Sequence, residues 1–391
     1  MRLRTLIKSN LLITPQREIQ RGAVLIENKK ILWAGPEGGL PATIEAKTID
    51  LGEKIIAPGF VDIHLHGFGG RMTFGSQEDL LTIASSLAKY GTTSFLPTID
   101  GVGNLSTLLE KLAQIREVMG KEKNAAQILG IHLEGPFLSA QEPAVGAQRA
   151  DWLRAPSLVE LEQMHQSAGG ALRYMTIAPE LEGAMKVIKK LNSFGIVASA
   201  GHSMASYEEI AKAIDLGLRS ICHMFNGMPP LHHRRAGLVG AALLRSELNA
   251  ELIGDGQHVG KEAMQILLQC KGVDGITLVT DNSQLTGLPS GRYKDVNGSL
   301  RIKTEFRCTN EEGRLAGSVM PLNTMVKTVM DLTGCSLAQV VQMASLNPAR
   351  LLGFSNKGSI EKGKDADLVA FDQGLNVNWA MIGGKIMEFG V

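Results

Sequence analysis

The chain has 391 residues, of which 44% are hydrophobic, which is ample for a large buried core and excludes intrinsic disorder. Lysine and arginine total 40 against 39 aspartate and glutamate residues, so the formal charge of +1 argues against a protein that binds nucleic acid or a membrane surface through bulk charge. All nine histidines lie between residues 64 and 258, so any chemistry based on imidazole belongs to the middle of the chain.

The two ends of the chain share one character. Residues 1–57 contain short strand-like runs separated by turns, with no helix of useful length, and residues 357–391 resemble them. Two β-rich ends around a different middle predict one small β-sandwich domain formed by residues 1–57 and 357–391. The strand-like runs are Leu6–Ile7, Leu11–Ile13, Ala23–Ile26 and Lys30–Trp33, and then Asp367–Phe371, Trp379–Ile382 and Lys385–Met387.

Residues 58–356 alternate between short apolar runs and amphipathic segments. The runs recur about every 30 residues, which is the length of one βα unit. Eight such units with continuously apolar strands predict an α/β fold, a (β/α)8 TIM barrel, and the alternative is an open doubly wound sheet. The expected strands are Phe60–His66, Thr93–Thr98, Ile128–Leu133, Tyr174–Ala178, Ile196–Ala200, Ser220–Phe225, Ala250–Gly254 and Ile276–Thr280. Expected helices include Glu78–Tyr90, Leu105–Met119, Leu158–Gln166, Ala184–Phe194, Ala205–Leu216 and Lys261–Cys270.

Polar residues stand at the C-terminal ends of these expected strands. In a barrel, active-site groups come from those ends and from the loops that follow them. Apolar runs alone predict these strands, so the gathering of polar residues at one end of them is independent support for the barrel. The residues concerned are His64, His66, His132, Glu134, His202, His223, Asp255, His258 and Asp281.

The spacing of several of these residues predicts a divalent metal site. His64 and His66 are two residues apart, so both side chains point to the same side of a strand. Glu134, His202 and His223 add one carboxylate and two imidazoles, a set that favours Zn²⁺, with Fe²⁺ as the alternative. A single buried histidine is usually a satisfied core residue, but unpaired polar groups at adjacent strand ends would be costly. One or two ions per chain fit these ligands.

Asp281 and a basic loop complete the candidate chemistry. A carboxylate that ends strand eight beside a metal can take a proton from water and return it to a leaving amine. Its alternative roles are a helix cap or a further ligand. The segment His232–Arg235 is either a solvated loop or an anion-binding loop, and its arginines suit forked contacts to phosphate.

Taken together, these motifs resemble the N-acetylglucosamine-6-phosphate deacetylases, a branch of the amidohydrolase superfamily. The similarity runs from about residue 55 to 370, and the motifs are specific when they occur in this order. They are His132–Phe137, Gly201–Ser203, His223–Arg234, Asp255–His258, Leu278–Asp281, Leu315–Ser318, Asn347–Arg350 and Gly363–Leu368.

The resemblance implies a metal-dependent hydrolase that removes acetate from a phosphorylated N-acetyl amino sugar, in a homodimer. It also implies a barrel that carries a small β-sandwich made from both termini. By this resemblance Glu134, His202 and His223 are metal ligands, and His64 and His66 match a pair kept by members that use two metals. Asp281 matches the general base and acid. The implied substrate contacts, some of which the neighbouring subunit can supply, are Asn226, Gly227, Arg234, His258, Gln148 and Leu315.

Three stretches depart from the family pattern. Arg235-Ala236 follows Arg234 where the family usually has Glu-Pro. Asn282–Gln284 follows Asp281 where the family favours a small residue and Met. Val319–Asn323 replaces a stretch that in the family usually ends in Leu-Thr-Met and an acidic residue. The first two could alter anion contacts or sugar specificity, but none involves the predicted metal ligands.

Three other functions are alternatives to this one. Related imide-cleaving or dihydroorotase-like enzymes often carry a carboxylated lysine at the end of strand four, and the stretch Met175–Pro179 contains no lysine. A deacetylase for the galactosamine-6-phosphate epimer stays open. A non-catalytic barrel used as a scaffold would typically have lost ligands, whereas every expected ligand is present.

Cysteine usage and apolar runs bear on location. The four cysteines are far apart and form no CxxC pair, which favours reduced thiols and a cytoplasmic location. The basic N-terminal stretch lacks the apolar region of a signal peptide, and no run approaches the ~20 apolar residues of a membrane span. We therefore expect neither a membrane nor a nucleic-acid partner.

Overall fold

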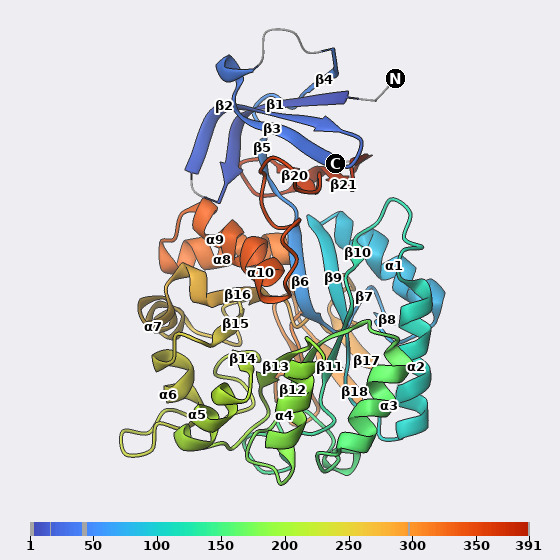
Figure 1. Cartoon of the computed structure of the whole chain (residues 1–391), viewed down its shortest axis with the longest axis vertical. Helices are drawn as coiled ribbons and strands as arrows, with labels where there is room; N and C mark the ends of the chain where they lie inside the picture. The colour runs from blue at the N-terminus through green and yellow to red at the C-terminus, as the bar shows by residue number, and fades with distance from the viewer. Residues whose placement is uncertain (1–3, 16, 41–44, 296–297, 390–391) are drawn as a thin grey trace.

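The computed structural model describes residues 4–15, 17–40, 45–295 and 298–389. Figure 1 shows a barrel surrounded by helices, with a separate sheet above it that contains strands from both ends of the chain. Among the described residues, no helix combines the length and the apolar character needed to cross a lipid bilayer.

The barrel consists of eight parallel strands in sequential order, which confirms the predicted fold. Both faces of such strands are covered, and every residue of the first two is buried. In order around the barrel the strands are β6 (Phe60–Leu65), β9 (Thr92–Ile99), β11 (Ile131–Glu134), β12 (Leu172–Ile177), β13 (Val197–Ala200), β14 (Leu218–Ile221), β15 (Asn249–Ile253) and β16 (Ile276–Val279). The short β10 (Gln127–Ile128) pairs with β9 ahead of β11.

The barrel closes between its last and first strands through contacts just beyond β16. The Thr280 hydroxyl donates to Asp62 Oδ2 at 2.6 Å, and the Asp281 N–H donates to the His64 carbonyl at 2.8 Å. Because strand one and strand eight meet here, Asp281 is brought beside the His64–His66 pair.

Helices form the outer layer of the barrel (Figure 1). Three of them, α1, α5 and α9, begin with a capping box in which a serine and the residue three positions later satisfy each other's backbone N–H groups. The helices are α1 (Gln77–Ala88), α2 (Leu105–Val118), α3 (Leu158–Ala168), α4 (Ala184–Ser193), α5 (Tyr207–Asp215), α6 (Gly237–Leu244), α7 (Lys261–Lys271), α8 (Leu322–Thr333), α9 (Leu337–Ala344) and α10 (Leu346–Leu351).

The two ends of the chain share one eight-stranded, mostly antiparallel sheet. Its order is β22-β21-β20-β5-β1-β2-β3, with β4 beside β1. Ile26 of β2 and Trp379 of β21 lie four strands apart yet pack in one cluster, so the sheet curls around its own core. The strands are β1 (Arg4–Thr14), β2 (Arg17–Glu27), β3 (Lys30–Pro36), β4 (Lys47–Asp50), β5 (Ile55–Pro58), β20 (Leu368–Phe371), β21 (Val377–Ile382) and β22 (Lys385–Glu388).

Two expected barrel strands differ from the observed ones. The expected strand Ile128–Leu133 is interrupted at Gly130, which has a φ of 157°, so β10 and β11 are separate strands. The expected strand Ser220–Phe225 ends at Ile221, because the chain turns at His223 with a φ of 25°. His223 therefore lies in the loop after its strand.

Some elements had no counterpart in the sequence prediction. A three-stranded antiparallel sheet follows β16, and its strands are only three or four residues long, too short to stand out as strand-like runs. It comprises β17 (Gly291–Lys294), β18 (Leu300–Lys303) and β19 (Cys308–Asn310). Helices α6 and α8–α10 were also not predicted. Smaller elements are β7 (Gly67–Phe68), β8 (Arg71–Met72) and the 3-10 helices η1 (Glu37–Gly39), η2 (Ala150–Trp152) and η3 (Val273–Gly275).

Candidate active site

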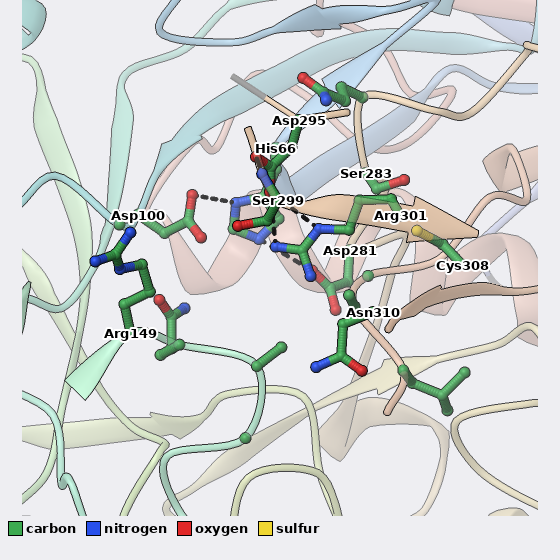
Figure 2. Close-up of a pocket in the computed structure, with 18 of the residues that line it drawn as sticks. His66, Asp100, Arg149, Asp281, Ser283, Asp295, Ser299, Arg301, Cys308 and Asn310 are labelled. Atoms are coloured by element: carbon green, nitrogen blue, oxygen red, sulfur yellow. Dashed lines mark hydrogen bonds and ion pairs between the residues drawn. The ribbon is translucent and has the colours of Figure 1, made fainter. Parts of the chain in front are cut away.

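A cavity of about 450 Å³ opens at the C-terminal end of the barrel strands. Its lining combines the candidate metal ligands and Asp281 with side chains from the β17–β19 sheet. In Figure 2, His66 lies between Asp100 and Asp281, and the Arg301 side chain of β18 is close to them. The sequence-predicted residues in the lining are His66, Glu134, Gln148, His202, His223, Asn226, Gly227, His258, Asp281 and Leu315.

Glu134, His202 and His223 converge on one point at the base of the cavity. Glu134 Oε1 lies 3.2 Å from His202 Nε2 and 3.0 Å from His223 Nε2, and the two Nε2 atoms are 3.0 Å apart. All three residues are buried. The structure thus brings together the three ligands that the sequence predicted from three separate strand ends.

The hydrogen bonds on the far side of each ring define what this cluster can bind. His202 Nδ1 lies 2.7 Å from the Ala144 carbonyl, and His223 Nδ1 lies 3.1 Å from the Asn226 carbonyl. A carbonyl oxygen can only accept, so each Nδ1 carries the hydrogen and each Nε2 presents a lone pair. Two lone pairs and a carboxylate oxygen face one another within 3.2 Å, an arrangement that fits a bound cation.

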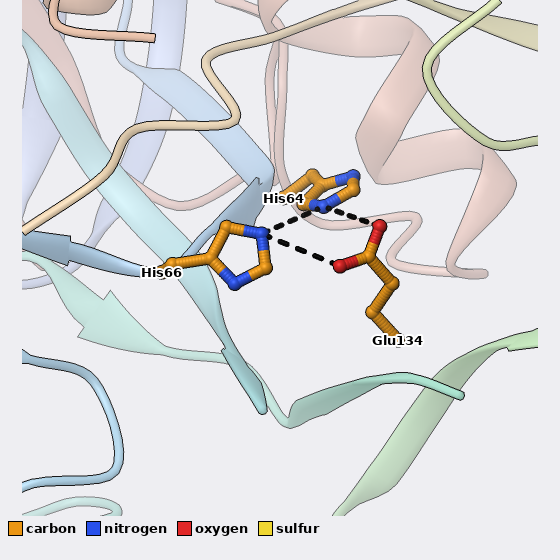
Figure 3. Close-up of side chains that lie close together, drawn as sticks. All are labelled: His64, His66 and Glu134. Atoms are coloured by element: carbon orange, nitrogen blue, oxygen red, sulfur yellow. Dashed lines mark hydrogen bonds and ion pairs between the residues drawn. The ribbon is translucent and has the colours of Figure 1, made fainter. Parts of the chain in front are cut away.

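His64 and His66 form the neighbouring half of the centre (Figure 3). Their Nε2 atoms are 3.2 Å apart, and they lie 3.6 Å from Glu134 Oε1 and 3.5 Å from Glu134 Oε2, respectively. His64 Nδ1 is 2.9 Å from Glu251 and His66 Nδ1 is 3.1 Å from Asp100. Glu134 therefore stands between two pairs of histidines, with one oxygen towards each of the two histidines in Figure 3.

The charges of this centre are strongly coupled. Burial by itself would raise the pKa of Glu134, but hydrogen bonds from the protonated rings of His202 and His223 hold that pKa well below its ordinary value. Burial lowers the pKa of His64, but the carboxylate of Glu251 outweighs burial and raises the pKa to about 9. Glu134 is therefore kept ionised, and a bound cation would take the place of the ring protons at Nε2.

Asp281 lies at the edge of both halves. Its Oδ1 is 3.0 Å from His66 Nε2 and 3.6 Å from His64 Nε2. Burial raises the pKa of Asp281, but the hydrogen bond from His66 and the charges of both histidines lower it below the ordinary value. The carboxylate is therefore held ionised, facing the cavity, and able to accept a proton.

The remaining predicted contacts surround the opening. His258 Nδ1 pairs with Asp255 Oδ2 at 2.7 Å, so the other ring nitrogen of His258 is directed away from Asp255. Gln148 donates to Glu134 Oε2 at 3.2 Å. A Cβ at Gly227, whose φ is 60°, would lie 3.0 Å from His202 Nδ1, so glycine is needed there.

Two predicted site residues do not line this cavity: His64, which is fully buried beside His66, and Arg234, which lies on the surface. Arg234 is exposed in the loop between β14 and α6, and its N–H donates to His232 Nδ1 at 3.2 Å. Arg234 does not belong to the cavity lining.

Comparison with known proteins identifies the family. The family model described as "Amidohydrolase family" matches residues 55–387. The chain belongs to the amidohydrolase family. It is 35% identical over 390 residues to N-acetylglucosamine-6-phosphate deacetylase of Bacillus subtilis, covering 97% of this chain and 96% of that protein. It is also 35% identical to N-acetylgalactosamine-6-phosphate deacetylase of Escherichia coli O157:H7, covering 90% of this chain and 93% of that protein.

Solved structures agree over the whole length. N-acetylglucosamine-6-phosphate deacetylase from Thermotoga maritima has 32% identity and a TM-score of 0.86, covering 97% of this chain and 99% of that one. A mutant of the Mycobacterium smegmatis deacetylase in complex with N-acetyl-D-glucosamine-6-phosphate has 28% identity and a TM-score of 0.91, covering 98% and 99%. The amidohydrolase family implies a divalent metal ion, and the donor sets described above fit one.

In this amidohydrolase, four polar residues at the centre were missed by sequence reasoning. Asp100 and Glu251 contact the histidine pair of strand one, while Arg149 and Arg301 line the cavity. Asp100 follows β9 directly, so the strand-end rule could have found it. Glu251 lies inside an apolar strand, where a charged residue is itself a signal, and the arginines come from loops and a sheet that the sequence did not mark.

Proposed function

We propose that this amidohydrolase removes the acetyl group of N-acetylglucosamine-6-phosphate to give glucosamine-6-phosphate and acetate. The observation that carries the proposal is the convergence of Glu134, His202 and His223 beside Asp281 in the cavity at the C-terminal end of the barrel strands. The names of the most similar relatives, and the substrate bound to one structural neighbour, support the choice of substrate.

Glu134, His202 and His223 would hold one divalent ion, and His64 and His66 with Glu134 would hold a second. One carboxylate and two imidazole nitrogens suit Zn²⁺ best, with Fe²⁺ as the alternative. When bound, such an ion supplies Lewis acidity that activates water and polarises an amide carbonyl.

Asp281 is the proton carrier of the reaction. Its ionised carboxylate accepts a proton as a water oxygen forms a bond to the acetamide carbon. The C–N bond then breaks, and Asp281 returns the proton to the departing sugar nitrogen, so that acetate and a free amine result. The position of Asp281, 3.0 Å from His66 Nε2 at the cavity wall, supports this double role.

The rest of the lining would orient the substrate. His258 is fixed by Asp255, and Asn226 is fixed by its hydrogen bond to the Met224 carbonyl at 3.1 Å. Rigid donors of this kind hold hydroxyl and phosphate groups so that the acetamide lies at the reacting groups. Gln148, the Gly227 backbone and Leu315 complete the set.

The exposed position of Arg234 favours a homodimer in which this arginine contacts the substrate phosphate in the neighbouring subunit. The neighbouring Arg235 adds a second positive charge to this exposed loop. We further propose a cytoplasmic location, and a division into a terminal domain (1–57 with 357–391) and a barrel domain (58–356).

The galactosamine epimer is the second candidate substrate. It is favoured by the relative from Escherichia coli O157:H7, which is as similar to this chain as the glucosamine enzyme of Bacillus subtilis is. The two sugars differ only at one ring hydroxyl, so a direct assay decides between them.

Acetate release from four substrates tests the proposal. The purified chain is offered N-acetylglucosamine-6-phosphate, its galactosamine epimer and both sugars without phosphate, and metal content is measured by elemental analysis. We expect the highest kcat/KM for the phosphorylated glucosamine substrate and complete loss of activity on chelation, reversed by Zn²⁺. Preference for the epimer would transfer the function to the second candidate, and no acetate from any of the four would refute both.

A further inference from the structure

Glu251 is a fully buried carboxylate in the interior of the barrel that the proposed reaction does not use. It lies in the middle of β15, among apolar neighbours, and is 0% exposed. An isolated buried carboxylate is costly, so its partners are informative. Its Oε2 atom accepts two hydrogen bonds, one from His64 Nδ1 at 2.9 Å and one from the backbone N–H of His223 at 3.0 Å.

The contact with His64 fixes the orientation of that imidazole. The His64 ring is 0% exposed, so no water can replace this partner. With Nδ1–H donated to Glu251, Nε2 is the ring nitrogen that faces His66 and Glu134 and the one left to bind a metal ion.

The contact with His223 fixes the loop after β14, which carries a proposed ligand of the other metal site, that of Glu134, His202 and His223. His223 has left its strand with a φ of 25°, so its N–H takes no part in the ladder of β14. The Glu251 side chain satisfies that N–H, and the Glu251 carbonyl accepts the next N–H, that of Met224, at 2.8 Å. Glu251 therefore contacts one histidine from each half of the centre, His64 and His223.

Asp100 provides an internal comparison. It faces His66 Nδ1 at 3.1 Å, but its side chain is 26% exposed and lies at the cavity wall. Water can take the place of Asp100 beside His66. Because His64 is fully buried, no water can replace Glu251 in the same way, so the orientation of His64 depends on the Glu251 carboxylate.

We propose that Glu251 is a positioning residue that prepares His64, together with His66 and Glu134, to bind the second divalent ion. The inference rests on the metal set of the proposed function, and it adds a residue that acts through the ligands. Outer carboxylates of this kind typically contribute about 10- to 100-fold in metal affinity.

Two substitutions separate the hydrogen bonds of Glu251 from its charge. Glu251→Gln keeps an oxygen that can accept from both His64 and His223 but removes the negative charge. Glu251→Met keeps the approximate volume and removes both acceptors. Thr277→Val is the matched control, because Thr277 is the register partner of Glu251 on β16, is fully buried, and has a hydroxyl without a hydrogen-bond partner among the described residues.

The experiment titrates the metal-free full-length chains with Zn²⁺ and measures bound ions and both affinities by calorimetry and elemental analysis. We expect two ions in the parent chain and in Thr277→Val. Glu251→Gln should bind the second ion about 10-fold more weakly with the first unchanged, and Glu251→Met should weaken the second about 100-fold and also the first. The ¹⁵N NMR signals of His64 should keep the Nδ1–H tautomer in Glu251→Gln and lose it in Glu251→Met.

Three results would overturn the proposal: a single ion in the parent chain, parent-like affinities in Glu251→Gln, or equal weakening of both ions in Glu251→Gln. If Glu251→Met fails to fold, Glu251→Gln alone decides. Two ions bound without any release of acetate would refute the proposed function and leave the positioning role intact.

Discussion

Two regions of this molecule bury charged side chains, and they do so in opposite ways. Where the terminal sheet meets the barrel, Lys357 Nζ lies 2.6 Å from Asp367 and 2.8 Å from Gln127 of β10. Each charge there has a partner of the opposite sign. The second region is the cavity end of the barrel, at the C-terminal ends of its strands, here called the mouth. There the Nε2 atoms of His202 and His223, which are acceptors in the neutral rings, lie within 3.2 Å of Glu134 Oε1, which is also an acceptor. The first arrangement is complete in itself, and the second is completed by a cation.

The two regions also differ in which residue types adopt left-handed backbone conformations. At the junction, left-handed positions are occupied by glycines such as Gly358 and Gly363, with φ of 80° and 88°. At the mouth, His202, His223 and Asp281 adopt φ of 46°, 25° and 49° although they carry side chains. Such residues cost about 1–3 kcal/mol each. The junction avoids backbone strain, whereas the mouth accepts it at the side chains to which the proposed reaction assigns a role.

The sharpest test of this contrast is Asp281→Asn, which should abolish function without affecting the fold. Loss of the proton carrier is expected to lower kcat by about 10²- to 10⁴-fold. Metal content and melting temperature should match the parent chain, and the exposed Asp274→Asn serves as control. Near-normal turnover with full metal occupancy would show that Asp281 is not the proton carrier.

The converse test is Lys357→Met at the junction. This change leaves Asp367 buried without its cation, and breaking a buried pair typically costs about 3–5 kcal/mol. Denaturant unfolding should show this loss, while kcat/KM per folded chain stays unchanged. The exposed Lys362→Met is the control. A stability equal to that of the parent would mean that the junction is not held by this pair.

A third test asks whether a single chain supplies every residue that contacts the substrate. Arg234→Ala should raise KM for the phosphorylated substrate about 10- to 100-fold, because a hydrogen bond to a charged group contributes about 1.5–3 kcal/mol. The unphosphorylated sugar should show no change. Arg235→Ala is the neighbouring control, and mixing Arg234→Ala with Asp281→Asn chains should restore activity if the arginine acts across subunits. Unaltered KM would place the phosphate against other residues.

The smallest expected effect is a pH dependence at the junction. Burial raises the pKa of Asp365, but Lys30 and Lys357 outweigh it and lower the pKa below the ordinary 3.8. A carboxylate whose pKa is lowered by folding stabilises the fold at pH values above its pKa in the unfolded chain. It loses that contribution as the pH falls through its pKa in the folded chain. Asp365→Asn should therefore lose about 0.5–1 kcal/mol at neutral pH, and this difference should vanish well below pH 3.8. A difference that persists in acid would exclude an electrostatic origin.

Much of the fold and the mouth could be predicted because the relevant signals are local. Continuous apolar runs about 30 residues apart indicate a barrel, and the strand-end rule then gathers Glu134, His202, His223 and Asp281 at one face. The spacing of His64 and His66 places both on one side of a strand.

Other features depend on contacts between distant segments. The partnership of His64 with Glu251 joins residues 187 positions apart, and no local pattern reveals it. The end of β14 before His223 depends on the turn that aims this ligand. The position of Arg234 outside the cavity depends on how a loop leaves the barrel, which its basic composition does not determine.

By itself, the sequence determined the order of the eight barrel strands, six of the helices around them and the strand ends that carry the candidate ligands, because these follow from periodicity and chain order. Only the tertiary structure decided how closely those groups meet and which neighbours orient them. Closure of the barrel brings β16 against β6 and so places Asp281 within 3.0 Å of His66. Distances of this kind arise from long-range packing, and long-range packing is not encoded in any single stretch of the chain.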